Sequence, residues 1–179
     1  MSKKALLVVD VQNDFCSKGS YPTPSGEDVI KPINKLLDFA RENNWLIIFS
    51  RDWHPKGMSH CVQNTKGAEF HPDLKIKPAD IVISKGIFDQ SETHYSVFNG
   101  EDNNLEELFV NNQVDKVYIV GLVFDYCVKY TALDSAYHGF DTTIIKDATR
   151  GIYKKIMPDQ LELELTQKGI HLINSDKIL

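Results

Sequence analysis

Four polar residues follow short apolar runs at separate places in the chain: Asp10, Asp52, Lys85 and Cys127. Singly, each has a structural interpretation, because aspartates end strands in turns, lysines are solvated and cysteines pack as small apolar residues. Together, Cys127, Asp10 and Lys85 form an acyl-transfer set. The thiol is the nucleophile, the carboxylate accepts its proton and passes it to the leaving group, and the ammonium stabilises the thiolate. We therefore predict a cysteine hydrolase that needs no histidine base.

The position of Cys127 in the sequence suits a nucleophile. It follows the segment Gly121–Tyr126 and precedes a helical pattern that contains Val128 and Ala132, so we expect it in the first turn of that helix. Unpaired backbone N–H groups and the positive end of the helix dipole lower a thiol pKa there, and they can also hold a developing oxyanion. The sequence thus predicts that Cys127 is held ionised.

A second set of residues has the spacing of a metal site. Asp52 and His54 lie two residues apart directly after an apolar run, and His60 follows six residues later. These side chains could share a divalent cation as a facial set of three ligands, with Zn²⁺ favoured and Mn²⁺ or Fe²⁺ as alternatives. The alternative is a polar loop with solvated histidines. The remaining histidines are assigned to surface or core: His71, His94, His138 and His171.

The elements that must position these residues alternate along the chain. Six apolar runs, continuous and rich in Val and Ile, predict strands buried on both faces: Ala5–Val9, Trp45–Phe49, Ile81–Ile83, Val117–Val120, Thr142–Ile145 and Ile170–Ile173. Apolar residues at helical spacing predict helices around residues 29–40, 105–109, 128–136 and 161–165. Gly139 and Gly169 are expected to cap the last two helices. The pattern predicts a three-layer α/β/α sandwich with a six-stranded, mainly parallel, Rossmann-like sheet.

Two long irregular segments, residues 52–79 and 86–100, leave the carboxyl ends of predicted strands. Open parallel sheets bind ligands at that edge, and loops of this length usually serve a site or a lid. We therefore expect both segments to border the site.

Composition restricts the class of protein. The 179 residues contain no repeat or linker, which predicts a single domain over residues 1–179. The formal charge of −5 disfavours nucleic acid and anionic membrane as partners. A small-molecule partner is expected instead, and the exposed helix faces leave monomer and homo-oligomer both open.

Location is predicted from the first residues and the cysteines. The apolar run Ala5–Val9 is shorter than the roughly 7–15 residues of a secretory signal core, and far shorter than a membrane span. The cysteines Cys16, Cys61 and Cys127 are too few and odd in number for a disulfide framework. Both observations predict a cytoplasmic protein.

Several segments, in order and spread over most of the chain, resemble one family of hydrolases: Val9–Phe15, Arg51–Pro55, His60–Thr65, Gly67–Phe70, Ser84–Gly86 and Gly121–Val128. They are similar to the nicotinamidase/pyrazinamidase branch of the isochorismatase-like hydrolases. The resemblance implies that fold. It also implies hydrolysis of nicotinamide to nicotinate and ammonia, in NAD salvage, through a cysteine thioester, with pyrazinamide as a further substrate.

The resemblance also implies a role for individual residues. Asp10, Lys85 and Cys127 would be catalytic, and Asp52, His54 and His60 would bind the metal. The backbone N–H groups of Val123 and Cys127 would form the oxyanion hole, after a cis Leu122–Val123 peptide bond. The substrate ring would be contacted by Phe15, Tyr95, Leu122, Val123 and Tyr126.

One departure from the family pattern bears on the substrate. Only Pro55–Ser59 separate His54 from His60, whereas the family usually has a longer loop that carries a substrate-stacking tryptophan and often another candidate ligand. Two alternatives therefore stand beside nicotinamidase activity. One is a related cysteine hydrolase for another small amide, and the other is a catalytically weak, thiol-bearing binding domain.

Overall fold

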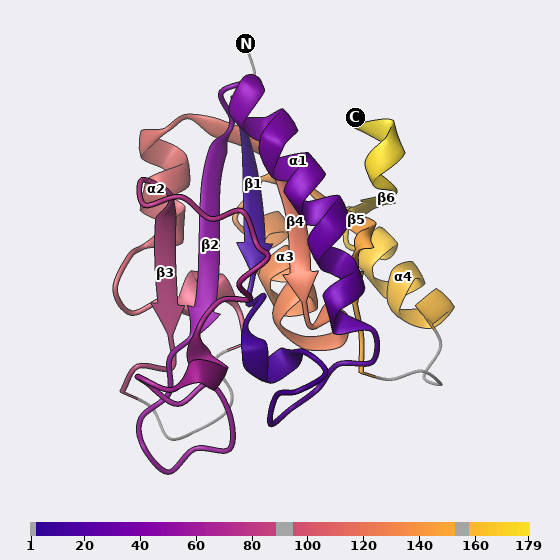
Figure 1. Ribbon diagram of the computed structural model, residues 1–179. Coiled ribbons are helices and arrows are strands. Elements are labelled where there is room, and N and C mark those ends of the chain that lie inside the picture. Colours follow the sequence, from indigo (N-terminus) through magenta and orange to yellow (C-terminus); the bar gives the residue numbers. More distant parts are fainter. Residues whose placement is uncertain (1–2, 89–94, 153–157) are drawn as a thin grey trace.

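The fold is a three-layer α/β sandwich around one parallel sheet (Figure 1). The computed structural model describes residues 3–88, 95–152 and 158–179. The strands are β1 (Lys3–Val9), β2 (Leu46–Asp52), β3 (Ile81–Lys85), β4 (Val114–Leu122), β5 (Asp141–Arg150) and β6 (His171–Ile173). Their order is β3-β2-β1-β4-β5-β6, and all five neighbouring pairs are parallel. The predicted fold class is confirmed, with a sheet that is wholly parallel.

The helices cover both faces of the sheet. They are α1 (Ile30–Glu42), α2 (Leu105–Asn111), α3 (Lys129–Tyr137) and α4 (Pro158–Gln167). The apolar residues of α1 pack in one core cluster, whereas those of α2, α3 and α4 belong to a second cluster on the opposite face (Figure 1). As predicted, Gly139 and Gly169 adopt positive φ angles of 87° and 81° just after α3 and α4.

The two clusters explain the continuous apolar runs. In β1, Leu6 and Val8 pack toward α1, while Ala5, Leu7 and Val9 pack toward the other face, and all five are completely inaccessible to solvent. Alternate side chains of a strand point to opposite faces, so a strand covered by helices on both faces has no polar position.

The order in which strands are added reverses at the centre of the sheet, between β1 and β4. From there the chain order runs outward to β3 on one side and β6 on the other, which is the strand order of dinucleotide-binding folds. Ligands bind at such switch points, outside the carboxyl ends of the strands. Gly121 permits close contact there, because a Cβ at its φ of 113° would lie 2.0 Å from the Val9 carbonyl oxygen.

The predicted irregular segments lie at this same edge. Between β2 and β3, the only regular element in the described chain is the 3₁₀ turn η3 (Lys66–Ala68), and η4 (Val97–Asn99) lies in the second segment. Residues 89–94 of that second segment, including His94, lie outside the described residues. Among the described helices, none has the length and apolar character needed to cross a membrane.

Candidate active site

Asp10 and Lys85 form a buried ion pair at the carboxyl edge of the sheet. Asp10 follows β1 with a positive φ of 48°, and its Oδ1 accepts a hydrogen bond of 2.6 Å from Ser50 Oγ. Its Oδ2 lies 2.9 Å from Lys85 Nζ, and both side chains are completely inaccessible to solvent. Apart from this ion pair, Oδ2 accepts no hydrogen bond from a described residue. One carboxylate oxygen is therefore available for a further proton.

Because the Lys85 side chain is long, its ammonium reaches functional groups at the ends of three other strands. Lys85 ends β3, which lies two strands from β1, or about 10 Å. Its ammonium contacts the Asp52 carboxylate on the neighbouring strand and reaches to 3.6 Å from Cys127 Sγ. The chain thus brings together Asp10, Lys85 and Cys127, as predicted from three distant segments.

Burial sets the protonation states in this cluster. It disfavours the Lys85 ammonium, but Asp10 and Asp52 outweigh that effect and hold the Lys85 pKa well above its usual range. Burial also raises the pKa of Asp10, an effect that Lys85 opposes. A carboxylate with a raised pKa is a stronger base, which suits proton transfer from a thiol.

The prediction of a resting thiolate is wrong. Burial raises the pKa of Cys127 well above its ordinary value, and the nearby Asp10 and Asp52 carboxylates add to that shift, while Lys85 only opposes it. Two negative charges beside one positive charge favour the neutral thiol. A carboxylate oxygen of Asp10 lies within 4.8 Å of Cys127 Sγ, so Asp10 is near enough to act as the base for the thiol.

Cys127 sits in a short π-helical turn, η5 (Phe124–Val128), that joins β4 to α3. The Val123 carbonyl accepts hydrogen bonds from the N–H groups of Tyr126 and Val128, at 3.0 and 3.2 Å. The Leu122–Val123 peptide bond is cis, as the family resemblance implied. The turn places both Val123 and Cys127 at the wall of one cavity.

Asp52, His54 and His60 also meet. One ligand atom from each lies within 4.8 Å of the other two, and both histidine Nε2 atoms lie 3.9 Å from an Asp52 carboxylate oxygen. His54 Nδ1 lies 3.3 Å from the Gly86 carbonyl oxygen, and His60 Nδ1 lies 2.9 Å from Ser59 Oγ. Because these contacts occupy Nδ1, each histidine presents Nε2 to the shared point, as metal-binding histidines do. The donor set fits a divalent metal ion.

Backbone contacts hold this second cluster in place. The Gln12 side-chain amide accepts from the Asp52 N–H at 2.8 Å and donates to the Asp52 carbonyl at 2.7 Å. His54 donates its backbone N–H to the Cys61 carbonyl at 2.9 Å, which joins the two histidine-bearing segments. Gly86 lets the His54 ring approach, because a Cβ there would lie 2.5 Å from the imidazole.

A cavity of about 100 Å³ opens beside Cys127. Its lining is mostly aromatic and comprises Phe15, Tyr21, Asp52, His60, Tyr95, Val123, Tyr126, Cys127 and Ile152. Drug-sized ligands occupy pockets of roughly 300–1,000 Å³, so this cavity suits a much smaller, single-ring compound.

Most predicted ring-contacting residues line this cavity, and Leu122 does not. Leu122 ends β4 with its side chain completely buried in the core cluster on the α1 face. Tyr21 and Ile152 also line the cavity, and the sequence patterns did not indicate either of them. Tyr21 lies in an irregular segment rich in Ser, Gly and Pro, where its size and aromatic character were the only available signal. Ile152 follows β5 and carried no signal, because its position depends on the Asp125 carboxylate, which accepts from the Ile152 N–H at 3.0 Å.

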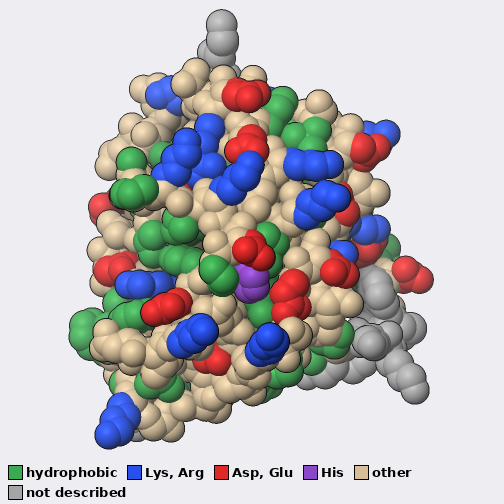
Figure 2. Space-filling view, viewed as in Figure 1, with side chains coloured by type: hydrophobic (Ala, Val, Ile, Leu, Met, Phe, Trp, Pro, Cys, Tyr) green, Lys and Arg blue, Asp and Glu red, His purple; other side chains and the backbone are tan. Residues whose placement is uncertain are grey.

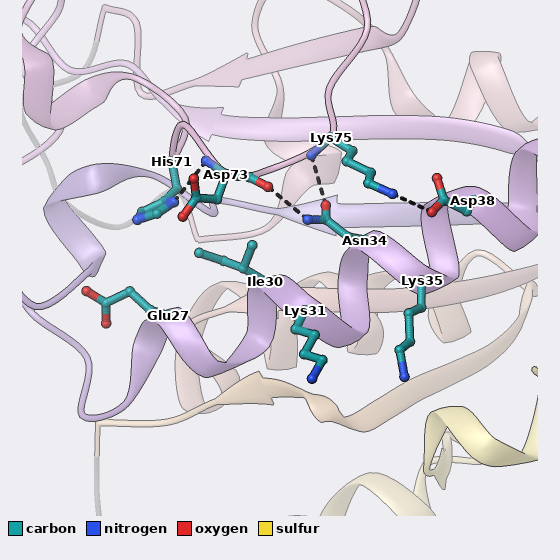
Figure 3. A pocket seen from close by; sticks show the side chains of 9 residues that line it. All are labelled: Glu27, Ile30, Lys31, Asn34, Lys35, Asp38, His71, Asp73 and Lys75. Atoms are coloured by element: carbon teal, nitrogen blue, oxygen red, sulfur yellow. Dashed lines mark hydrogen bonds and ion pairs between the residues drawn. The ribbon is translucent and has the colours of Figure 1, made fainter.

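A wider groove of about 600 Å³ lies elsewhere, between α1 and residues 71–75 (Figure 3). Its polar groups pair with one another: Asn34 bonds the backbone of Asp73 and Lys75, and Lys75 Nζ lies 2.6 Å from Asp38. No cysteine lines it. On this face of the molecule, basic and acidic side chains are interspersed (Figure 2).

Fold and site together define a three-layer α/β protein with a buried Cys–Asp–Lys centre beside a candidate metal site. The family model of the isochorismatase domain matches residues 4–175, and the chain belongs to this family.

Three similar proteins that match most of the chain are nicotinamidases or pyrazinamidases. A nicotinamidase of Escherichia coli is 32% identical over 85% of both chains. A nicotinamidase/pyrazinamidase of Mycobacterium tuberculosis is 31% identical over 96% of this chain and 99% of its own. The crystal structure of the Pyrococcus horikoshii pyrazinamidase in complex with zinc is 35% identical, with a TM-score of 0.88, over 96% of this chain and 99% of that one.

Proposed function

We propose that this protein is an amidohydrolase that converts nicotinamide to nicotinate and ammonia in NAD salvage, with pyrazinamide as a second substrate. One observation carries the proposal: Cys127 Sγ, 3.6 Å from the Lys85 ammonium, lies at the wall of a small, aromatic-lined cavity. The similarity to nicotinamidases over most of the chain supports the choice of substrate.

The proposed first step is attack by sulfur on the amide carbonyl. Asp10 accepts the thiol proton as the carbon–sulfur bond forms, and the backbone N–H groups of Val123 and Cys127 hold the oxyanion. The carbon–nitrogen bond then breaks, and Asp10 returns the proton to the departing nitrogen as ammonia. Asp10 next takes a proton from water as the water oxygen attacks the thioester. The carbon–sulfur bond then breaks, Asp10 returns that proton to sulfur, and the product acid leaves and ionises to nicotinate.

Lys85 is proposed to make this chemistry feasible in a buried site. Burial raises the pKa of the Cys127 thiol, and the Asp10 and Asp52 carboxylates add to that shift, so the resting thiol is neutral. The Lys85 ammonium offsets the negative charge that develops on sulfur as the proton leaves. The pair Asp10 and Lys85 thus lets Cys127 react without a permanent thiolate.

Asp52, His54 and His60 are proposed to hold one divalent metal ion, with Zn²⁺ favoured and Mn²⁺ or Fe²⁺ as alternatives. When bound, the ion would supply a Lewis acid that orients the pyridine nitrogen. The protein's own part is to exclude water from the ring with Phe15, Tyr95 and Tyr126, whose aromatic faces suit a pyridine ring.

The test measures ammonia release from nicotinamide by the purified protein and by a Cys127→Ala variant. The wild type should release ammonia and the variant should not, while intact release by Cys127→Ala would contradict the mechanism. A panel of amides separates the alternatives: equal or better turnover of nonaromatic amides, such as carbamoyl compounds, indicates a different amidase. Thiol reactivity without ammonia from any amide indicates a binding domain.

We also propose that the chain forms a single domain and that the protein is cytoplasmic. One domain over residues 1–179 is supported by a single sheet with strands from Lys3 to Ile173. A cytoplasmic location is supported by three free, buried cysteines. Size-exclusion chromatography with light scattering would decide between monomer and homo-oligomer.

A further inference from the structure

Tyr21 and His60 form an aromatic pair at the mouth of the cavity. Their ring centroids lie 5.3 Å apart with an interplanar angle of 32°, and both residues line the cavity. The Phe15 ring also lies near His60, with ring centroids 5.4 Å apart. Tyr21 is 48% exposed, whereas Phe15 is buried, so Tyr21 forms the outer part of the wall.

The Asp14 carboxylate holds the two segments that carry this pair. Its Oδ1 accepts from the Ser20 N–H at 3.0 Å and its Oδ2 from the Cys61 N–H at 2.7 Å. Ser20 precedes Tyr21 and Cys61 follows His60. The Asp14 carbonyl also accepts the Tyr21 N–H at 2.9 Å. One buried carboxylate thus fixes the backbone on both sides of the aromatic pair.

We propose that Tyr21 is a specificity-determining residue that contacts the substrate ring, and that Asp14 is the residue that positions it. This inference rests on the proposed function and adds to it a residue outside the Cys127 centre and the Asp52 cluster. His54 and His60 are separated by only five residues, Pro55–Ser59, and no aromatic residue lies in that short loop. Tyr21 supplies an aromatic surface at the open side of the cavity from a different segment.

The direct test is nicotinamide binding by calorimetry in a Cys127→Ala background, with zinc present in excess. Adding Tyr21→Ala should raise the dissociation constant about 3- to 10-fold, the range expected for one lost aromatic contact. Tyr21→Phe keeps the ring and should bind within about twofold of the background. Tyr137→Ala is the matched control, because Tyr137 is 87% exposed on α3 and does not line the cavity.

Kinetics in the otherwise unaltered enzyme give a second readout. Tyr21→Ala should raise KM for nicotinamide by the same factor with kcat within about twofold, and it should change KM for a nonaromatic amide less. Unchanged binding and KM in Tyr21→Ala would overturn the inference while leaving the proposed function intact. A wild type that neither binds nor hydrolyses nicotinamide would overturn both.

Asp14 is tested by Asp14→Asn, which keeps the size of the side chain but turns an N–H donor toward one of the two backbone N–H groups. The variant should raise KM with little loss of kcat at saturating zinc. Asp14 also holds the segment of His60, and saturating zinc limits that second effect. Under this condition Asp14 acts through Tyr21, and the double variant Asp14→Asn/Tyr21→Ala should be little worse than Tyr21→Ala alone. Effects that multiply would show that Asp14 does not position Tyr21.

Discussion

Lys85 Nζ lies 2.9 Å from Asp10 Oδ2, and neither side chain has any contact with solvent. The Lys85 ammonium also contacts the Asp52 carboxylate, so one positive charge offsets two negative ones in the interior. Buried ion pairs contribute little net stability, but removal of one partner leaves an uncompensated charge. Residues placed for catalysis are therefore also required for the fold.

Lys85→Met should destabilise the protein by about 3–5 kcal/mol, because Asp10 and Asp52 would lose their cation. The measurement is urea unfolding followed by circular dichroism. Lys75→Met is the matched control, since its pair with Asp38 is about half exposed (55% and 50%) and such surface pairs contribute about 0–1 kcal/mol. Equal stability losses in the two variants would contradict the structural role of Lys85.

Asp10→Asn should lower kcat for nicotinamide by about 10²–10⁴-fold, because the amide cannot accept the Cys127 proton. The variant keeps the size of the side chain, and circular dichroism checks that the fold is retained. Asp38→Asn, at an exposed position on α1, serves as the control and should keep wild-type kcat. Near-normal turnover by Asp10→Asn would rule out Asp10 as the general base.

His54→Ala should lower the amount of zinc retained after dialysis to well below that of the wild type, because it removes one of three ligands. Metal content by mass spectrometry is the measurement, so this prediction does not depend on activity. His71→Ala is the control, as His71 lies outside the Asp52, His54 and His60 cluster. Equal retention in both variants would contradict the assigned ligand set.

In the wild type, chelation should abolish ammonia release, and added Zn²⁺, Mn²⁺ or Fe²⁺ should restore it.

Asp14 should make stability depend on pH. Burial acts to raise its pKa, but hydrogen bonds from the Ser20 and Cys61 N–H groups outweigh that effect and hold the pKa below its ordinary value of 3.8. A carboxylate with a lowered folded-state pKa stabilises the fold above its unfolded-state pKa, and that contribution is lost as pH falls through the folded-state pKa. Asp14→Asn should therefore be less stable than wild type at pH 7, by about 1–3 kcal/mol.

The difference between Asp14→Asn and wild type should shrink as the pH falls below the ordinary aspartate pKa of 3.8, because protonated Asp14 resembles the amide. Urea unfolding at a series of pH values measures it. A difference that stays constant over this range would show that the charge on Asp14 does not stabilise the fold.

Much of the fold could be predicted from the sequence. Continuous apolar runs such as Ala5–Val9 predicted strands buried on both faces, and helical spacing predicted the four α-helices found among the described residues, since both patterns depend on residues close together in the chain. The structure lengthens several strands: β2 and β3 include Asp52 and Lys85, and β4 continues to Leu122. Strand ends are hard to predict because ladder hydrogen bonds continue past the last apolar residue.

The sequence by itself determined which groups could do the chemistry, because Asp10, Lys85 and Cys127 lie at or beyond the carboxyl ends of strands that a parallel sheet brings to one edge. Only the tertiary structure decided the charge on the Cys127 thiol. That charge depends on how deeply the thiol is buried and on which charged side chains lie within a few ångströms of it. It also decided that Leu122 faces the core and that Tyr21 faces the cavity. Side-chain direction and electrostatic interaction depend on distances between segments far apart in the chain, and the spacing of residues along the sequence does not specify those distances.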